Sequence, residues 1–172
     1  LLTFSLFDTL FARDAFADAV KPITVRWLAD VNALGHDVKD QKIKQLEWQK
    51  KIEELYAQVD LADLLKFIDF EKLTAAVDFP EHGARSLRPQ FPELDGVPTK
   101  LVFGKQVFAM KKGRSVVPHG HNNMATAFLI LKGGFHGRHY DRLGEESDHF
   151  LIRPTIDRAF TAAELGFSAP AR

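Results

Sequence analysis

The hydrophobic pattern of this chain changes its period at a proline-rich stretch, and that change most constrains how the chain can fold. From about residue 14 to residue 79, apolar residues recur at spacings of three and four, which is typical of amphipathic helices. After residue 100, short segments rich in β-branched and aromatic residues alternate with glycine or charged turns, which is typical of a sandwich or barrel. Seven such segments follow one another: KLVFG, QVFAMKK, RSVVPH, TAFLILK, FHGRHYD, HFLIR and DRAFTA.

The change of period predicts three parts within a mainly β fold. Residues 1–80 form an α-helical N-terminal extension, residues 81–99 a Pro-rich connector, and residues 100–172 a β-barrel. The charged run KQLEWQKKIEEL is expected to be the solvated face of a helix rather than a partner-binding surface. No internal repeat interrupts this order.

Local signals mark the ends of the expected helices. Pro22 suits the first turn of a helix, and Gly35 suits the position just past its end. Asp37 or Asp40 is then expected to cap the second helix. A third helix follows at LADLLKFI and a fourth after it.

Charge and composition exclude several classes of function. The 23 basic and 23 acidic residues balance, whereas a nucleic-acid clamp needs an excess of Lys and Arg. The chain has no cysteine, which excludes disulfides, thiolate metal sites and a cysteine nucleophile. No stretch approaches the roughly 18 unbroken apolar residues of a membrane span, and the apolar opening LLTFSLFDTLFARDAF lacks the basic region and cleavage site of a signal peptide. A cytoplasmic protein with neither nucleic-acid nor membrane partners is therefore expected.

The residues that carry chemistry are His119 and His121. Residues two apart in a strand point to the same face, so both imidazoles are expected on one side. Two converging neutral imidazoles make half or more of a transition-metal site. An H-x-H pair by itself favours two surface histidines at a strand end. No Gly-rich phosphate loop, G-x-S-x-G elbow or H-E-x-x-H helix offers a competing site.

This part of the chain resembles the first signature of the cupin superfamily, G-x5-H-x-H-x3-4-E-x6-G. Gly113, His119 and His121 match it at the required spacing, and Gly133 lies seven positions after Thr126, where the family acid falls when the gap is four. The resemblance implies a cupin-type antiparallel β-barrel (jelly roll) that holds a metal in its mouth. It leaves the helical half unexplained.

Two departures from the family pattern matter. The signature glutamate is absent, because Ala125 and Thr126 stand in its place. That loss is similar to the three-histidine thiol dioxygenases, whose third histidine comes from a later strand. The second cupin signature has no match after His149, so the barrel is expected to be incomplete at its C-terminus.

The third metal ligand is expected to be His139. Counting from the Gly133 turn puts Phe135, Gly137 and His139 at the inward positions that the resemblance implies. His136, which lies three residues before His139, replaces it if a bulge shifts the register. A residue beyond Arg172 is the remaining alternative. Together with His119 and His121, these residues imply a divalent transition metal, iron first, with manganese, nickel or zinc as alternatives.

Arg and Asp residues are interleaved around the later histidines. Such residues on neighbouring strands usually form cross-strand ion pairs on an outer face. The functional alternative is that Arg138 or Arg153 grips a substrate carboxylate through its two-pronged donor geometry. Tyr140 is the accompanying candidate, as a hydrogen-bond donor to bound substrate.

Three functions follow from these residues. The first is a metal-dependent, Fe-type oxygenase acting on a small organic acid. The second is a non-enzymatic cupin that binds or senses a small ligand and uses the helical half as an oligomerisation arm. The third is a metal-free barrel with vestigial histidines. A homodimer is expected, because cupins commonly dimerise and the amphipathic helices carry Trp27 and Trp48.

Overall fold

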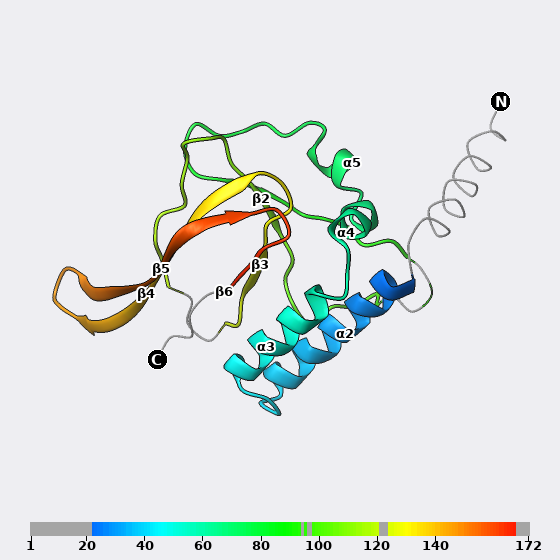
Figure 1. The fold of residues 1–172 in the computed structure, drawn as a ribbon, viewed down its shortest axis with the longest axis horizontal. Helices are drawn as coiled ribbons and strands as arrows, with labels where there is room; N and C mark the ends of the chain where they lie inside the picture. The colour runs from blue at the N-terminus through cyan, green and yellow to red at the C-terminus, as the bar shows by residue number, and fades with distance from the viewer. Residues whose placement is uncertain (1–21, 94, 96–97, 121–123, 168–172) are drawn as a thin grey trace. The chain divides into compact units, whose positions relative to one another are not determined.

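The computed structural model describes residues 22–93, 95, 98–120 and 124–167, and within them helices precede strands (Figure 1). The predicted order of helices followed by antiparallel strands is therefore confirmed. The helices are α2 (Pro22–Lys39), α3 (Gln45–Tyr56), α4 (Leu61–Phe67) and α5 (Phe70–Thr74). The strands are β1 (Arg85–Leu87), β2 (Val107–Ala109), β3 (Ala127–Leu129), β4 (Gly134–Glu145), β5 (Phe150–Thr161) and β6 (Leu165–Phe167).

The helix starts follow the local signals more closely than the helix ends do. Pro22 opens α2, and the Asp60 side chain caps α4 by accepting the backbone N–H of Ala62 at 2.7 Å. Gly35, however, does not end α2, which continues to Lys39. A Cβ at Gly35 would lie 2.6 Å from Cγ1 of Val102, so this glycine makes room for close packing.

The second helix also begins later than expected. Trp48 donates its backbone N–H to the carbonyl of Lys44 at 2.9 Å, so α3 starts at Gln45. Neither Asp37 nor Asp40 therefore caps it. Asp37 still belongs to α2.

The described strands form three two-stranded antiparallel sheets, β1–β2, β3–β6 and β4–β5. Closing a barrel requires a neighbour on both sides of each strand, and each strand here has one. The described part of the chain is therefore mixed, with helices and antiparallel sheets, rather than mainly β, and its strands do not close into a barrel. The predicted strands KLVFG and RSVVPH are not strands, and β1 falls inside the predicted connector.

Two of the sheets belong to one long antiparallel ribbon. β4 pairs with β5 from Gly134↔Thr161 to the hairpin tip, and β3 pairs with β6 just beyond the other end. Between the two sheets, Ala163 donates its N–H to the carbonyl of Ile130 at 2.8 Å, and Ile130 donates to Glu164 at 3.0 Å. These hydrogen bonds continue the pairing. The short β3–β6 pair and the long β4–β5 pair therefore follow one another along the same two antiparallel chain segments.

β5 joins two segments that the sequence pattern separates at Pro154. The register shifts between His139 and Tyr140, where Ile156 and then Pro154 are the partners, and Thr155 is left without one. Proline has no N–H to donate to the hydrogen bonds between paired strands. A strand can therefore accommodate proline at a bulge, where this pairing is interrupted. HFLIR and DRAFTA therefore form one strand.

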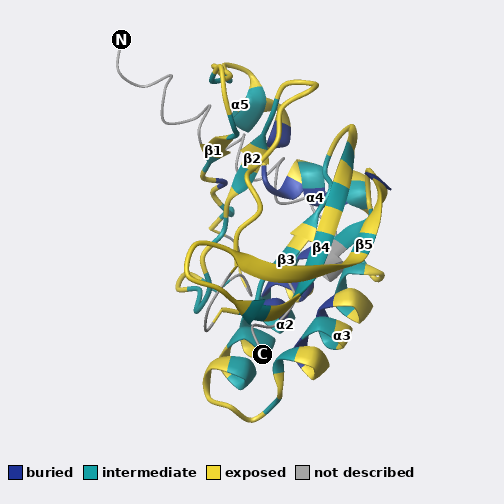
Figure 2. Ribbon diagram, turned by 90° about the vertical axis from the view of Figure 1, so that its left-hand side faces the viewer, coloured by how far each residue is buried: buried dark blue, intermediate teal, exposed yellow. Residues whose placement is uncertain are grey.

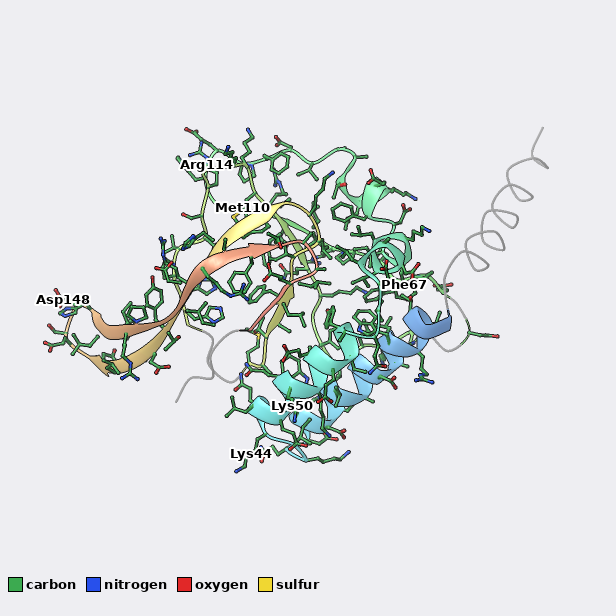
Figure 3. The ribbon with its side chains drawn as sticks, in the orientation of Figure 1. Lys44, Lys50, Phe67, Met110, Arg114 and Asp148 are labelled. Atoms are coloured by element: carbon green, nitrogen blue, oxygen red, sulfur yellow. The ribbon has the colours of Figure 1, made fainter. Side chains whose placement is uncertain are left out.

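The chain divides into two compact units that interleave along the sequence. The first unit contains the described residues up to His36 and Leu55–Ser115, and the second contains Asp37–Glu54 and the residues from Val116 on. The predicted sequence boundaries near residues 80 and 99 stay a prediction. Phe67, which Figure 3 labels, is buried in the first unit and stacks on Phe91 with ring centroids 5.4 Å apart.

The second unit buries fewer large side chains. Trp48, Ile52 and Phe160 are buried in it, whereas most of the β4–β5 ribbon is intermediate or exposed (Figure 2). None of the described helices combines the length and the apolar composition that crossing a bilayer requires.

Candidate metal centre

His119 lies in an exposed segment without regular structure, before β3. Its Nδ1 is 2.8 Å from the carbonyl oxygen of Val117. A carbonyl oxygen only accepts hydrogen bonds, so Nδ1 must carry the proton in this contact. In a neutral imidazole with this tautomer, the lone pair is on Nε2. His121 lies outside the described residues.

His139 lies on the more buried face of β4. Phe135, Gly137 and His139 alternate with more exposed neighbours, as the count from the Gly133 turn predicts, and His139 pairs with Ile156 on β5. Partial burial lowers the pKa of the His139 imidazole below its usual 6.5, because the charged form is poorly solvated there. Burial therefore favours the neutral imidazole, which is the form that binds metals.

His136 lies on the opposite face and has a different partner. Its Nε2 donates to the carboxylate of Asp157, and Arg138 donates to the same carboxylate from Nε at 3.3 Å. The hydrogen bond from His136, and secondarily that from Arg138, lowers the pKa of Asp157 below its usual value. Both register shifts of this ribbon follow His139, so neither brings His136 to the His139 face.

The Arg and Asp residues form the cross-strand ion pairs that their interleaving favours. Arg138 pairs with Asp157, and Arg153 pairs with Asp141 at 2.9 Å, all on partly exposed side chains. Such pairs typically contribute between about 0 and 1 kcal/mol. Tyr140 is half-buried opposite Pro154. A substrate-binding role for Arg138 and Tyr140 stays a prediction.

His149 is at the far end of the hairpin. Its Nδ1 is 2.7 Å from the carboxylate of Asp148, which lies at the tip of the ribbon (Figure 3). The hairpin closes where Glu146 donates its N–H to the carbonyl of His149 at 2.9 Å. This places His149 away from the end of β4 that begins at Gly134.

Thr126, which lies between the histidine segment and β3, has an unusual environment. Thr126, immediately before β3, has a buried hydroxyl that finds no hydrogen-bond partner among the described residues. Buried hydroxyls are normally satisfied, so an orphaned one indicates a missing partner. A hydroxyl both donates and accepts, which suits a polar ligand or a bound water.

Sequence reasoning missed one residue that contacts this region. Gln45, the first residue of α3, donates from its side-chain amide to the carbonyl of Met124 at 3.2 Å. The two residues are 79 positions apart, and no local pattern signals such a contact.

No group of three His, Cys, Asp or Glu side chains within the described ranges is placed to hold one metal ion. Burial favours the neutral form of the His139 imidazole, which is the form that binds metals. In comparisons with known proteins, the chain matches no protein-family model, no curated protein and no solved structure.

Proposed function

We propose that this chain is a metal-binding protein of the cupin type, in which His119, His121 and His139 hold a divalent transition metal. The observation that carries the proposal is the hydrogen bond from His119 Nδ1 to the Val117 carbonyl, 2.8 Å long. Metal-binding histidines typically donate their second ring N–H to a carbonyl or carboxylate, which fixes the ring and its coordinating nitrogen.

The continuous ribbon of β3–β6 and β4–β5 supports the jelly-roll part of the proposal. A jelly roll is built from long antiparallel segments that remain paired as they wind around two sheets. The ribbon has this pairing and the bulge at Pro154, where an antiparallel pair bends. Further strands at the free edges of β4 and β5 would complete a barrel.

Iron is the first candidate for the metal, and an oxygenase acting on a small organic acid is the finer proposal. Iron held by histidines with open positions supplies the chemistry of binding and activating O₂. The chain itself supplies the neutral imidazole of His139, the Thr126 hydroxyl as a hydrogen-bonding group, and Arg138 and Tyr140 as contacts to substrate. Arg138 must leave Asp157 to grip a substrate carboxylate through both prongs of its guanidinium.

A non-enzymatic ligand-binding cupin is the second candidate, and the ion pairs favour it. Arg138 and Arg153 are each bound to a carboxylate of this chain, so neither is ready to receive an organic acid. In that case the metal is structural, and a homodimer through the helical half remains part of the proposal.

Metal analysis of the purified, untagged protein tests the shared part of both functions. We expect about one equivalent of iron, manganese, nickel or zinc in the wild type and none in the His119→Ala/His121→Ala variant. His82→Ala is the matched control, since His82 is an exposed histidine of the connector. A wild type that holds no metal even after reconstitution refutes the site.

The third ligand is tested by two further variants. His139→Ala should lower the affinity for the reconstituted metal at least tenfold, whereas His136→Ala should leave it unchanged, because the two side chains lie on opposite faces of β4. The reverse order would make His136 the ligand. Equal affinity in both variants would place the third ligand elsewhere. Oxygen consumption with thiols and small carboxylic acids then separates the oxygenase from the binding protein.

A further inference from the structure

Near the tip of the β4–β5 ribbon, large apolar side chains stay exposed on both faces. Phe150, Leu151 and Ile152 are 55%, 44% and 49% exposed, and Leu143 on β4 is 60% exposed. Successive residues of a strand point to opposite faces, so the described part of the chain covers neither face of this half. Phe160, in the other half of β5, is by contrast only 6% exposed. A two-stranded hairpin without cover is marginally stable in water, so the outer half of the ribbon is a candidate for binding a partner.

The backbone of β5 has free hydrogen-bonding groups along its outer edge. Among the described strands, β5 pairs only with β4. At the hairpin tip, Glu146 donates its N–H to the carbonyl of His149, so His149 directs its backbone groups toward β4. In an antiparallel pair this direction alternates from one residue to the next. Phe150 and Ile152 therefore direct their N–H and C=O groups to the free edge, and Leu151 directs its groups to β4.

The position of Pro154 agrees with this alternation. Pro154 lies two residues after Ile152, so its nitrogen belongs to the free edge as well. A proline within a sheet is tolerated where its missing N–H would have faced away from the neighbouring strand. Pro154 also ends the stretch of edge that can donate hydrogen bonds, which leaves Phe150 and Ile152 as its donors.

The exposed triplet of Phe150, Leu151 and Ile152 is complementary to itself. When two copies of the chain meet antiparallel with a two-fold axis at Leu151, Phe150 of each copy lies opposite Ile152 of the other. The outward backbone groups of these residues then face one another, so each of the two pairs exchanges two hydrogen bonds. Pairs of an aromatic and a β-branched residue stabilise a sheet by roughly 0.2–1 kcal/mol each. Leu151 meets Leu151 of the other copy on the opposite face.

Other positions of the axis give a poorer match. Moving it to Ile152 places Phe150 opposite Pro154, which has no N–H to donate. Moving it to Phe150 places Ile152 opposite Asp148, a charged residue of the tip outside β5. Any extended peptide can form hydrogen bonds with a free edge, and the symmetry of the triplet about Leu151 is what favours a copy of the same chain.

We infer that the Phe150–Ile152 edge of β5 binds the same edge of a second copy, which gives a four-stranded sheet in the order β4–β5–β5–β4. The contact uses one surface on both copies, so it closes as a dimer. It is independent of the proposed metal site and of the helical half. A pairing this short belongs to the size class below about 1,200 Å², so we expect a dissociation constant in the micromolar range.

The test measures dimerisation of the full chain by sedimentation equilibrium over a range of concentrations. Leu151→Lys places two ammonium groups opposite each other at the axis, and Leu151→Glu places two carboxylates there, so each variant opposes pairing with itself. Each should dimerise at least about tenfold more weakly than the wild type. An equimolar mixture of the two should recover the dimer to within about threefold of the wild type, because lysine then faces glutamate.

Leu143→Lys is the matched control, since it adds the same charge at an exposed leucine of the same ribbon but away from the β5 edge. It should dimerise as the wild type does, and circular dichroism should be the same for all variants. A wild type that stays monomeric up to about 1 mM overturns the inference. Undiminished dimerisation of both Leu151 variants would place the interface elsewhere. If the mixture of the two variants stays monomeric, or if Leu143→Lys loses as much affinity as Leu151→Lys, the pairing at Leu151 is wrong. None of these outcomes bears on the metal site.

Discussion

Gly137 is the position where a single methyl group should reveal how tightly the β4–β5 ribbon packs. A Cβ built there would lie 2.6 Å from Cε2 and 2.9 Å from Cδ2 of Phe160. Phe160 is only 6% exposed, and the guanidinium carbon of Arg158 lies 3.7 Å from its ring centroid. The ring therefore has little room to move away.

The expected change in the free energy of unfolding of Gly137→Ala is the difference between two effects. Overpacking of this kind typically costs about 1–3 kcal/mol, whereas replacing a strand glycine by alanine gains roughly 0.5–1 kcal/mol of backbone entropy. Gly137→Ala should therefore lower the free energy of unfolding by about 1 kcal/mol, within a range of roughly 0–2.5 kcal/mol.

Urea unfolding followed by circular dichroism and tryptophan fluorescence measures this change. Gly144→Ala is the control on the same strand, because its Cβ would lie 3.6 Å from Leu151 Cδ1, an ordinary contact. It should raise the free energy of unfolding by roughly 0.5–1 kcal/mol, because only the gain in backbone entropy applies there. Adding Phe160→Leu to Gly137→Ala should restore part of the loss, since the two changes act on one contact. Equal stability of Gly137→Ala and Gly144→Ala would refute the reasoning.

Three further predictions follow from other contacts. A hydrogen bond from Arg158, with others from the β5–β6 turn, lowers the pKa of Glu164 to about 2, so its stabilising effect is complete above pH 4.5 and is lost as the pH falls through 2. Thermal melts of Glu164→Gln should show a smaller acid-induced fall over that range, and an identical fall would contradict the assignment. Asp60→Ala should cost about 1 kcal/mol by removing the cap of α4, measured by chemical denaturation, and no loss would mean that the cap is unimportant. Gly35→Ala should destabilise the protein by about 1 kcal/mol despite its better helix propensity, because its Cβ would meet Val102; a higher melting temperature would show that Val102 can move aside.

The faces on which His136 and His139 lie could be predicted, because they depend on the backbone geometry of a strand alone. Alternation along a strand places His139 on one face and His136 on the other, and the register and burial of β4 confirm this. The partner of His119 could not be predicted, since a hydrogen bond across two residues depends on an irregular backbone that no pattern specifies. No sequence pattern signals the hydrogen bond from Gln45 to Met124, because the two residues are 79 positions apart.

The local features of this protein follow from short stretches of its sequence. Pro22 and Asp60 start helices, and the change of period separates helices from strands, because these features depend on interactions within a few residues. Only the tertiary structure decided that Gly35 lies inside a helix and that two predicted strands merge through Pro154. It also decided that the strands pair two by two and that α3 belongs with the ribbon. These outcomes depend on which distant side chains pack together, and periodicity specifies which face is apolar but not what covers it.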